Sequence, residues 1–163
     1  MERALDPLTW LPNRPLFEER LARAIACVRG TRMALALLFI DLDRFAQVNT
    51  VLGRETGDQV LRLAAARIAR ALGPRATPAR LEGDDFAALV KVPDLPAAAK
   101  VAGEVLEHCR EPYVIDCLAL TVTASIGISL YPAHSTSAQA LMERAERALY
   151  RAKIAGRNRY FPD

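Results

Sequence analysis

An uninterrupted apolar run of eight residues, Met33 to Ile40, constrains the fold of this chain more than any other feature. The run is far shorter than the ~20 residues that cross a bilayer, so it predicts no membrane span. A turn comes before it and the acidic segment Asp41-Leu42-Asp43 follows it, as expected for a central strand covered on both faces. With 163 residues and 52% hydrophobic content, the chain is long enough to bury roughly 70% of its unfolded surface around such a strand.

Five further stretches predict helices, most of them with apolar residues at three- and four-residue steps. Suitable capping residues mark several of their ends, with Asn13, Asp94 and Ser137 as N-caps and Gly30 and Gly156 after last turns. The helices are expected at about 16–28, 44–52, 57–72, 95–110 and 138–155.

The remaining strands are expected mainly as hairpins. Segments 76–81 and 86–92 flank Glu82-Gly83-Asp84-Asp85, and the alternating segment Leu120 to Leu130 is expected to pair with Tyr113 to Leu118. Helices therefore alternate with hairpins, which predicts an α+β fold with a mainly antiparallel or mixed sheet and helices packed on it. With no internal repeat, low-complexity segment or linker, residues 1–163 are expected to form a single domain.

Charge and cysteine content indicate the class of protein. The net charge of +3, from 22 basic and 19 acidic residues, is too small to argue for a nucleic-acid partner. The start of the chain does not resemble a signal peptide. Cys27, Cys109 and Cys117 are widely spaced and show no metal-binding pattern, so we expect reduced core thiols in a cytoplasmic protein, with a disulfide or a zinc site as the alternatives.

Acidic and basic clusters are the candidate functional residues. Asp41-Leu42-Asp43 and Asp84-Asp85 lie at strand ends, where carboxylates are either solvated turn residues or ligands of a hard cation such as Mg²⁺. Gly83 beside them allows the backbone to approach a phosphate closely. Near the end of the chain, Arg151, Lys153, Arg157 and Arg159 form either a solvated helix end or a phosphate-facing cluster.

Several motifs together resemble GGDEF domains, the diguanylate cyclase family. Asp6 to Arg14 reads DPLTWLPNR, which is similar to the family's opening DPLTGLPNR. Asp41 to Asp58 is similar to its DLDxFKxxND and LGHxxGD segments, and Arg80 to Phe86 lies where RxGGDEF belongs. Segments 122–128 and 148–158 resemble its closing signatures, so the resemblance covers essentially the whole chain.

The resemblance implies a fold and a set of site residues. It implies a palm-like domain, similar to nucleotidyl cyclases, that binds GTP with Mg²⁺ as cofactor. By position, Asp41, Asp84 and the Leu42 carbonyl would hold the metal, and Asp85 would activate a hydroxyl. The remaining site residues by position are Asn49 and Asp58 for the guanine, Gly83 for close backbone approach to the nucleotide, and Lys153 and Arg157 for the phosphates.

Departures from the family pattern cluster where the nucleotide would lie. Glu82 replaces the first glycine of the signature, and a carboxylate about 6 Å from a phosphate costs about 3 kcal/mol at an effective dielectric constant near 20. Ala46 replaces a phosphate-binding lysine, and Thr50 and Arg54 replace an acid and a histidine. Asp85 keeps a carboxylate but is one methylene shorter than the family's glutamate.

These departures favour a degenerate GTP- and Mg²⁺-binding module that regulates a linked domain, such as an EAL phosphodiesterase. The first alternative is an active diguanylate cyclase, which would condense two GTP to cyclic di-GMP as a homodimer paired through the active-site face. The second alternative is a nucleotide-free dimerisation scaffold. In each case the resemblance implies a domain cut from a longer signalling protein, with sensor or output domains elsewhere and no membrane contact by this domain.

Overall fold

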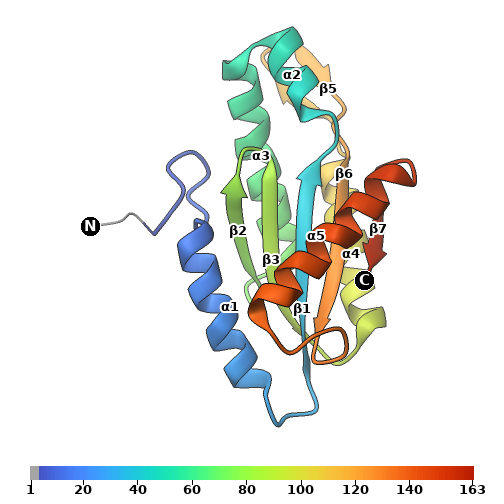
Figure 1. The fold of residues 1–163 in the computed structure, drawn as a ribbon. Helices are drawn as coiled ribbons and strands as arrows, with labels where there is room; N and C mark the ends of the chain where they lie inside the picture. Colours follow the sequence, from blue (N-terminus) through green and yellow to red (C-terminus); the bar gives the residue numbers. More distant parts are fainter. Residues whose placement is uncertain (1–3) are drawn as a thin grey trace.

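The computed structural model describes residues 4–163 and is built around one five-stranded sheet (Figure 1). The strands lie in the order β2-β3-β1-β6-β7, and β4 and β5 form a separate two-stranded sheet. The elements are α1 Arg14–Val28, β1 Ala34–Leu42, α2 Phe45–Leu52, α3 Arg54–Leu72, β2 Thr77–Glu82, β3 Asp85–Val92, α4 Leu95–Cys109, β4 Tyr113–Ile115, β5 Leu118–Leu120, β6 Ala124–Tyr131, α5 Ala138–Ile154 and β7 Tyr160–Pro162.

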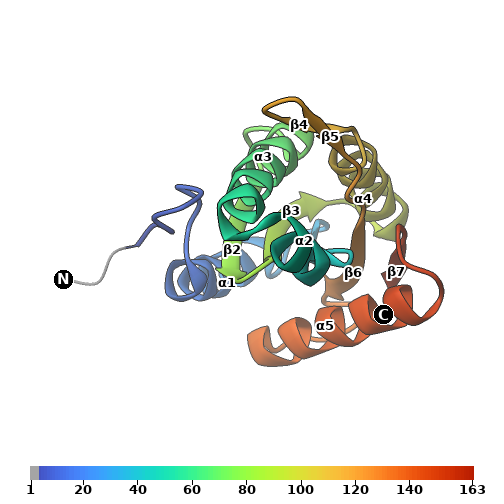
Figure 2. The ribbon, with the colours of Figure 1, turned by 90° about the horizontal axis from the view of Figure 1, so that it is seen from above.

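Helices cover both faces of the sheet, so the chain folds into three layers (Figure 2). On one face α1 and α5 pack against Leu35, Leu37 and Phe39 of β1. On the other face α3 and α4 pack against the alternate residues of β1, including Leu38 and Ile40. The expectation of a doubly covered central strand is confirmed, and the α+β class with a mostly antiparallel sheet is confirmed with it.

The sheet joins segments that are far apart in the sequence. β1 is antiparallel to both β3 and β6, and its last residues stand opposite the hairpin, with Asp41 paired to Asp85. The final extended segment, β7, runs parallel to β6 and makes the sheet mixed. The ends of β1 and of the β2–β3 hairpin therefore meet at one edge, where the acidic residues gather.

The strand expected at Leu120 to Leu130 is interrupted. β5 ends at Leu120 and β6 begins at Ala124, and β5 pairs with β4 rather than extending the central strand. Thr123 lies between them and binds Asp43 twice, through its carbonyl from the Asp43 amide at 2.8 Å and through its hydroxyl to the Asp43 carboxylate at 2.6 Å. These contacts tie the end of the segment to β1 while residues before it turn away.

All of β6 is buried, because helices cover both of its faces. The polar positions that alternation placed on one face are accommodated by local contacts, as when the Ser129 hydroxyl donates to the Leu141 carbonyl at 2.7 Å. At Gly127 the α5 backbone comes so close that an added Cβ would overlap the Ala145 carbonyl and the Leu149 amide. Glycine at this position lets α5 lie directly on the sheet.

Two smaller expectations are wrong. The helix expected from Gly57 begins earlier, at Arg54, because Gly53 with φ 90° serves as the boundary between α2 and α3. Only Cys109 is a core thiol, with burial raising its pKa to about 12, whereas Cys27 and Cys117 are exposed. All three cysteines are free. Within residues 4–163, no helix is both long and apolar enough to cross a membrane.

Candidate functional site

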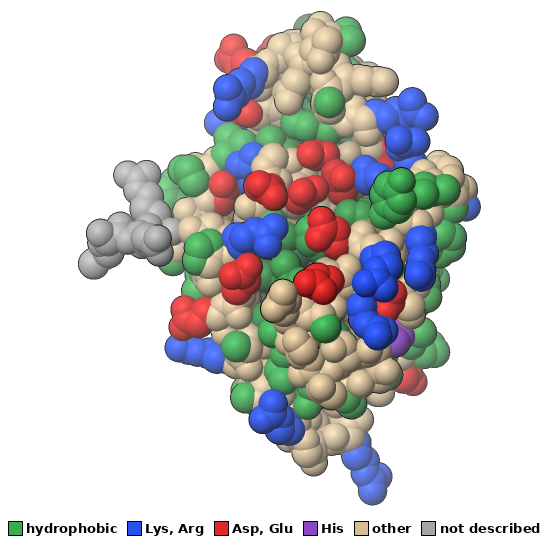
Figure 3. All heavy atoms as spheres, in the orientation of Figure 1, with side chains coloured by type: hydrophobic (Ala, Val, Ile, Leu, Met, Phe, Trp, Pro, Cys, Tyr) green, Lys and Arg blue, Asp and Glu red, His purple; other side chains and the backbone are tan. Residues whose placement is uncertain are grey.

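Three carboxylates converge where β1 meets the β2–β3 hairpin. Asp41 comes from the end of β1, and Asp84 and Asp85 come from the hairpin turn and the start of β3. One oxygen from each lies within 4.8 Å of the others. Lys153 of α5 reaches the same point, with its Nζ 2.9 Å from Asp41 Oδ2. The acidic band across this face is visible in Figure 3.

The carboxylates repel one another in this half-buried position. Burial and the neighbouring Asp84 raise the pKa of Asp41 to about 7, against the opposing effect of Lys153. Burial and the charges of Asp41 and Glu82 raise the pKa of Asp85 to about 6. Asp41 Oδ1 is buried and has no hydrogen-bond partner among the described residues.

This donor set fits a hard divalent cation. Mg²⁺ prefers carboxylate and carbonyl oxygens, and a cation would relieve the repulsion among Asp41, Asp84 and Asp85. Leu42 lies in the same strand, and its amide faces the Asp84 carbonyl at 3.4 Å. That the Leu42 carbonyl assists as a ligand stays a prediction.

A small pocket beside the hairpin brings together the residues expected to read a base. The pocket has a volume of about 310 Å³, and Asn49, Asp58, Arg54 and Gly83 are among the residues that line it. Asn49 lies on α2 and Asp58 on α3. The two helices approach closely because position 57 is glycine, where a Cβ would overlap the Asn49 side chain. The amide and carboxylate offer donors and acceptors suited to the edge of a purine.

Arg80 fixes the hairpin turn against the start of the chain. Its Nε donates to the Gly83 carbonyl at 2.9 Å, and its Nη1 lies 3.1 Å from Asp6 Oδ1. Burial alone would raise the pKa of Asp6, but hydrogen bonds from Thr9 and Arg80 outweigh burial and lower it below 3.8. The Arg80 amide also donates to the Pro12 carbonyl at 3.0 Å. Arg80 therefore links the turn that carries Asp84 to Asp6 and Pro12 at the start of the chain.

Glu82, the main departure from the family signature, does not line this pocket, although its charge lies close enough to raise the pKa of Asp85. Its side chain is 74% exposed and lies 3.8 Å from Arg14 of α1. A β-bulge between Arg80 and Glu82 accompanies this orientation. The carboxylate thus faces solvent and a cation, not the interior of the pocket that Asn49 and Asp58 line.

Asp43 is an organising residue whose role the sequence analysis did not identify. It is buried, and its carboxylate accepts hydrogen bonds from Thr123 Oγ1 at 2.6 Å, Ser125 Oγ at 2.7 Å and the Asn158 amide at 3.0 Å. Lys153 Nζ lies 3.7 Å away. Its position two residues after Asp41 was the available signal, but its partners are about 80 to 115 residues distant in sequence.

The expected phosphate-binding residues fall in two places. Lys153 lies with the carboxylates, whereas Arg157 lines a neighbouring pocket with Asp43 and Arg44. Arg157 adopts a left-handed backbone conformation, with φ 66°. The structure thus groups Asp41, Asp84, Asp85 and Lys153 at one point and Asn49, Asp58 and Gly83 in the adjoining pocket.

Comparison with known proteins identifies the family of the chain. Residues 3–159 match the family model described as diguanylate cyclase, GGDEF domain. The chain is 39% identical over 155 residues to the bifunctional diguanylate cyclase/cyclic di-GMP phosphodiesterase MucR of Pseudomonas aeruginosa, covering 95% of this chain and 23% of the relative. It is 35% identical to the cyclic di-GMP phosphodiesterase NbdA of the same organism, covering 94% of this chain and 20% of the relative.

A solved structure matches along nearly its whole length. The GGDEF domain of TpbB (YfiN) from P. aeruginosa superposes with a TM-score of 0.92 and 39% identity, covering 97% of this chain and 93% of that one. By contrast, the chain spans only about a fifth of the length of MucR and NbdA. The family match over residues 3–159, together with this superposition, shows that the chain belongs to the GGDEF family of cyclic di-GMP signalling domains.

Proposed function

We propose that this domain binds GTP together with Mg²⁺ and regulates a linked domain in response. The observation that carries the proposal is the convergence of Asp41, Asp84 and Asp85 within 4.8 Å, next to the pocket that contains Asn49 and Asp58. A metal subsite beside a base-sized pocket suits a nucleoside triphosphate, whose phosphates carry the charge and whose base carries the specificity.

Each group has a distinct role in this proposal. Asn49 and Asp58 hydrogen-bond the guanine, and Gly83 lets the backbone approach the ribose and phosphates. Asp41 and Asp84 hold Mg²⁺, assisted by the Leu42 carbonyl. When bound, the metal would screen the triphosphate charge. Lys153 and Arg157 supply positive charge to the phosphates.

Two features favour regulation over turnover. Ala46 stands where the family pattern has a phosphate-binding lysine, so this cation is missing. Asp85 is shorter than the family's glutamate, which places its carboxylate one methylene further from a substrate hydroxyl. Similarity to MucR and NbdA, whose names include a cyclic di-GMP phosphodiesterase activity, supports an EAL-type phosphodiesterase as the linked domain. A sensor domain is the other expected neighbour, and the cytoplasm is the compartment where GTP and Mg²⁺ are available.

The orientation of Glu82 favours a second candidate, an active diguanylate cyclase. Because the carboxylate lies beside Arg14 and is exposed to solvent, we expect it to repel a bound triphosphate less strongly than its place in the signature suggests. In that case two domains would pair through their active-site faces. Each 3′-hydroxyl would attack the partner's α-phosphate, Asp85 would accept the proton, and pyrophosphate would leave.

These functions are separated by calorimetric titration of the domain with GTP and Mg²⁺, followed by chromatography of the solution in the calorimeter to detect cyclic di-GMP. Binding without cyclic di-GMP supports the regulatory module, and binding with cyclic di-GMP supports the cyclase. Absence of binding overturns both and leaves the dimerisation scaffold. Asp84→Asn should abolish the Mg²⁺-dependent part of binding, whereas Asp116→Asn, an exposed turn residue outside the site, should leave it unchanged.

A further inference from the structure

A second and larger pocket lies on a different side of α2 from Asn49. Its volume is about 530 Å³, within the range of small-molecule sites. It shares none of its lining residues with the pocket that contains Asn49 and Asp58. We propose that this pocket binds an amphipathic organic anion, with a hydrocarbon body and one negatively charged head.

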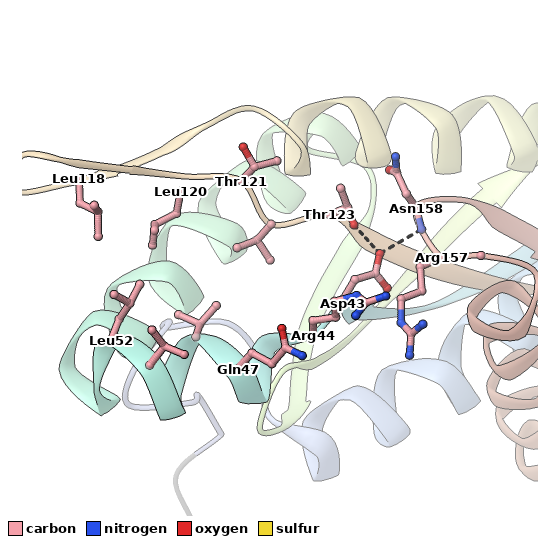
Figure 4. Close-up of a pocket in the computed structure, with 14 residues that line it drawn as sticks. Asp43, Arg44, Gln47, Leu52, Leu118, Leu120, Thr121, Thr123, Arg157 and Asn158 are labelled. Carbon is pink, nitrogen blue, oxygen red and sulfur yellow. Dashed lines mark hydrogen bonds between the residues drawn. The ribbon is translucent and has the colours of Figure 1, made fainter.

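One end of the pocket is aliphatic. Three of its side chains come from α2 and three from β5 and the segment that follows it, as Figure 4 shows for the labelled residues. These six are Val48, Val51, Leu52, Leu118, Leu120 and Val122. Val51 is 77% exposed and Leu118 45% exposed, so this wall is in contact with solvent. A hydrocarbon chain lying on it would remove apolar surface from water.

The other end of the pocket is cationic. Arg44 and Arg157 line it; among the described residues neither guanidinium has a hydrogen bond or ion pair, and Arg157 Nε is buried without a partner. Asp43 is also present, but its oxygens already accept bonds from Thr123, Ser125 and the Asn158 amide. Two guanidinium groups against one carboxylate leave this end of the pocket with a net positive charge, so it favours an anion.

The arrangement of the two ends selects the ligand class. Figure 4 places Arg44 and Arg157 at one side of the pocket and Leu52, Leu118 and Leu120 at the other, so a ligand that satisfies both ends must be extended. Among the residues that the structure describes, no aromatic side chain lines the pocket, so a nucleobase has nothing to stack on. A medium-chain carboxylate matches the shape and the charge.

The test is calorimetric titration of the domain with decanoate, without nucleotide or Mg²⁺. Decanoate should bind, while acetate, which has only the head, and 1-decanol, which has only the body, should bind at least about tenfold more weakly. Omitting GTP keeps the result independent of the proposed function, although Arg157 serves in both sites.

Variants locate the binding. Val51→Asp should weaken decanoate binding about tenfold or more, because it places a carboxylate on the aliphatic wall. Val114→Asp is the matched control, since Val114 is 66% exposed, lies outside the pocket and should change nothing. Arg44→Gln should weaken decanoate binding and leave 1-decanol binding unaltered. The proposal is overturned if decanoate does not bind, if 1-decanol binds equally well, or if Val51→Asp has no effect.

Discussion

Removing the charge of Glu82 tests how far the signature departure affects nucleotide binding. At an effective dielectric constant near 20, a carboxylate about 6 Å from a phosphate costs about 3 kcal/mol, which predicts a gain of one to two decades in GTP affinity for Glu82→Gly. The Glu82 side chain, however, is 74% exposed and pairs with Arg14. At the dielectric constant of water, the same distance gives only about 0.7 kcal/mol, or about threefold.

We therefore expect Glu82→Gln, which keeps the side-chain shape, to raise GTP affinity by about threefold at most. The assay is the dissociation constant for GTP in saturating Mg²⁺ at low ionic strength, where screening is weakest. Glu18→Gln is the control, because Glu18 also pairs with Arg14, at 3.5 Å, but lies on α1. A tenfold gain specific to Glu82→Gln would refute this reasoning, since the carboxylate would then face the nucleotide.

Three further predictions concern stability and reactivity. The pKa of Asp41 is raised to about 7, so ionisation of this carboxyl destabilises the folded domain as pH rises from about 4 through 7. In metal-free buffer, the melting temperature of Asp41→Asn should therefore exceed that of wild type at pH 8 but not at pH 4. The variant should also lose the stabilisation that Mg²⁺ gives to wild type. In urea unfolding, Gly127→Ala should destabilise the domain by about 3 kcal/mol or prevent folding, because α5 lies directly on that position. The control is Gly103→Ala on α4, where an added Cβ meets open space; it should be neutral or stabilising by up to about 1 kcal/mol. In the native domain, a colorimetric thiol reagent should modify Cys27 and Cys117 rapidly, and the buried Cys109 only after denaturation. Rapid modification of all three thiols would instead show that α4 opens in the native domain.

Local patterns predicted most of the fold, because the elements are regular and buried. The apolar run at 33–40 became the central strand, and Asn13 and Asp94 cap their helices through side-chain bonds of 3.2 Å and 3.0 Å. The interruption at 121–123 was not predictable, because the alternation of apolar and polar residues runs through these positions without a break. At this point Asp43, a residue distant in sequence, holds Thr123 against β1, and the residues before it pair with β4 instead.

The site was predicted in its residue types but not in its geometry. Spacing placed Asp41 and Asp84 at strand ends, and the antiparallel register brought them together. The exposed position of Glu82 is accompanied by a contact with Arg14 and a bulge in β2, neither of which the signature motif indicates. The exposure of the Glu82 side chain lowers the electrostatic effect that we expect from its charge, and residue identity alone does not indicate this reduction.

Arg80 links the first turn of the domain directly to the β2–β3 hairpin. Along the chain these parts are separated by three helices and a strand, but through this one side chain Asp6 and Gly83 are tied by contacts of 3.1 Å and 2.9 Å. Because one side chain holds both segments, a substitution at Arg80 would remove the link between Asp6 and the turn that carries Asp84 in a single step.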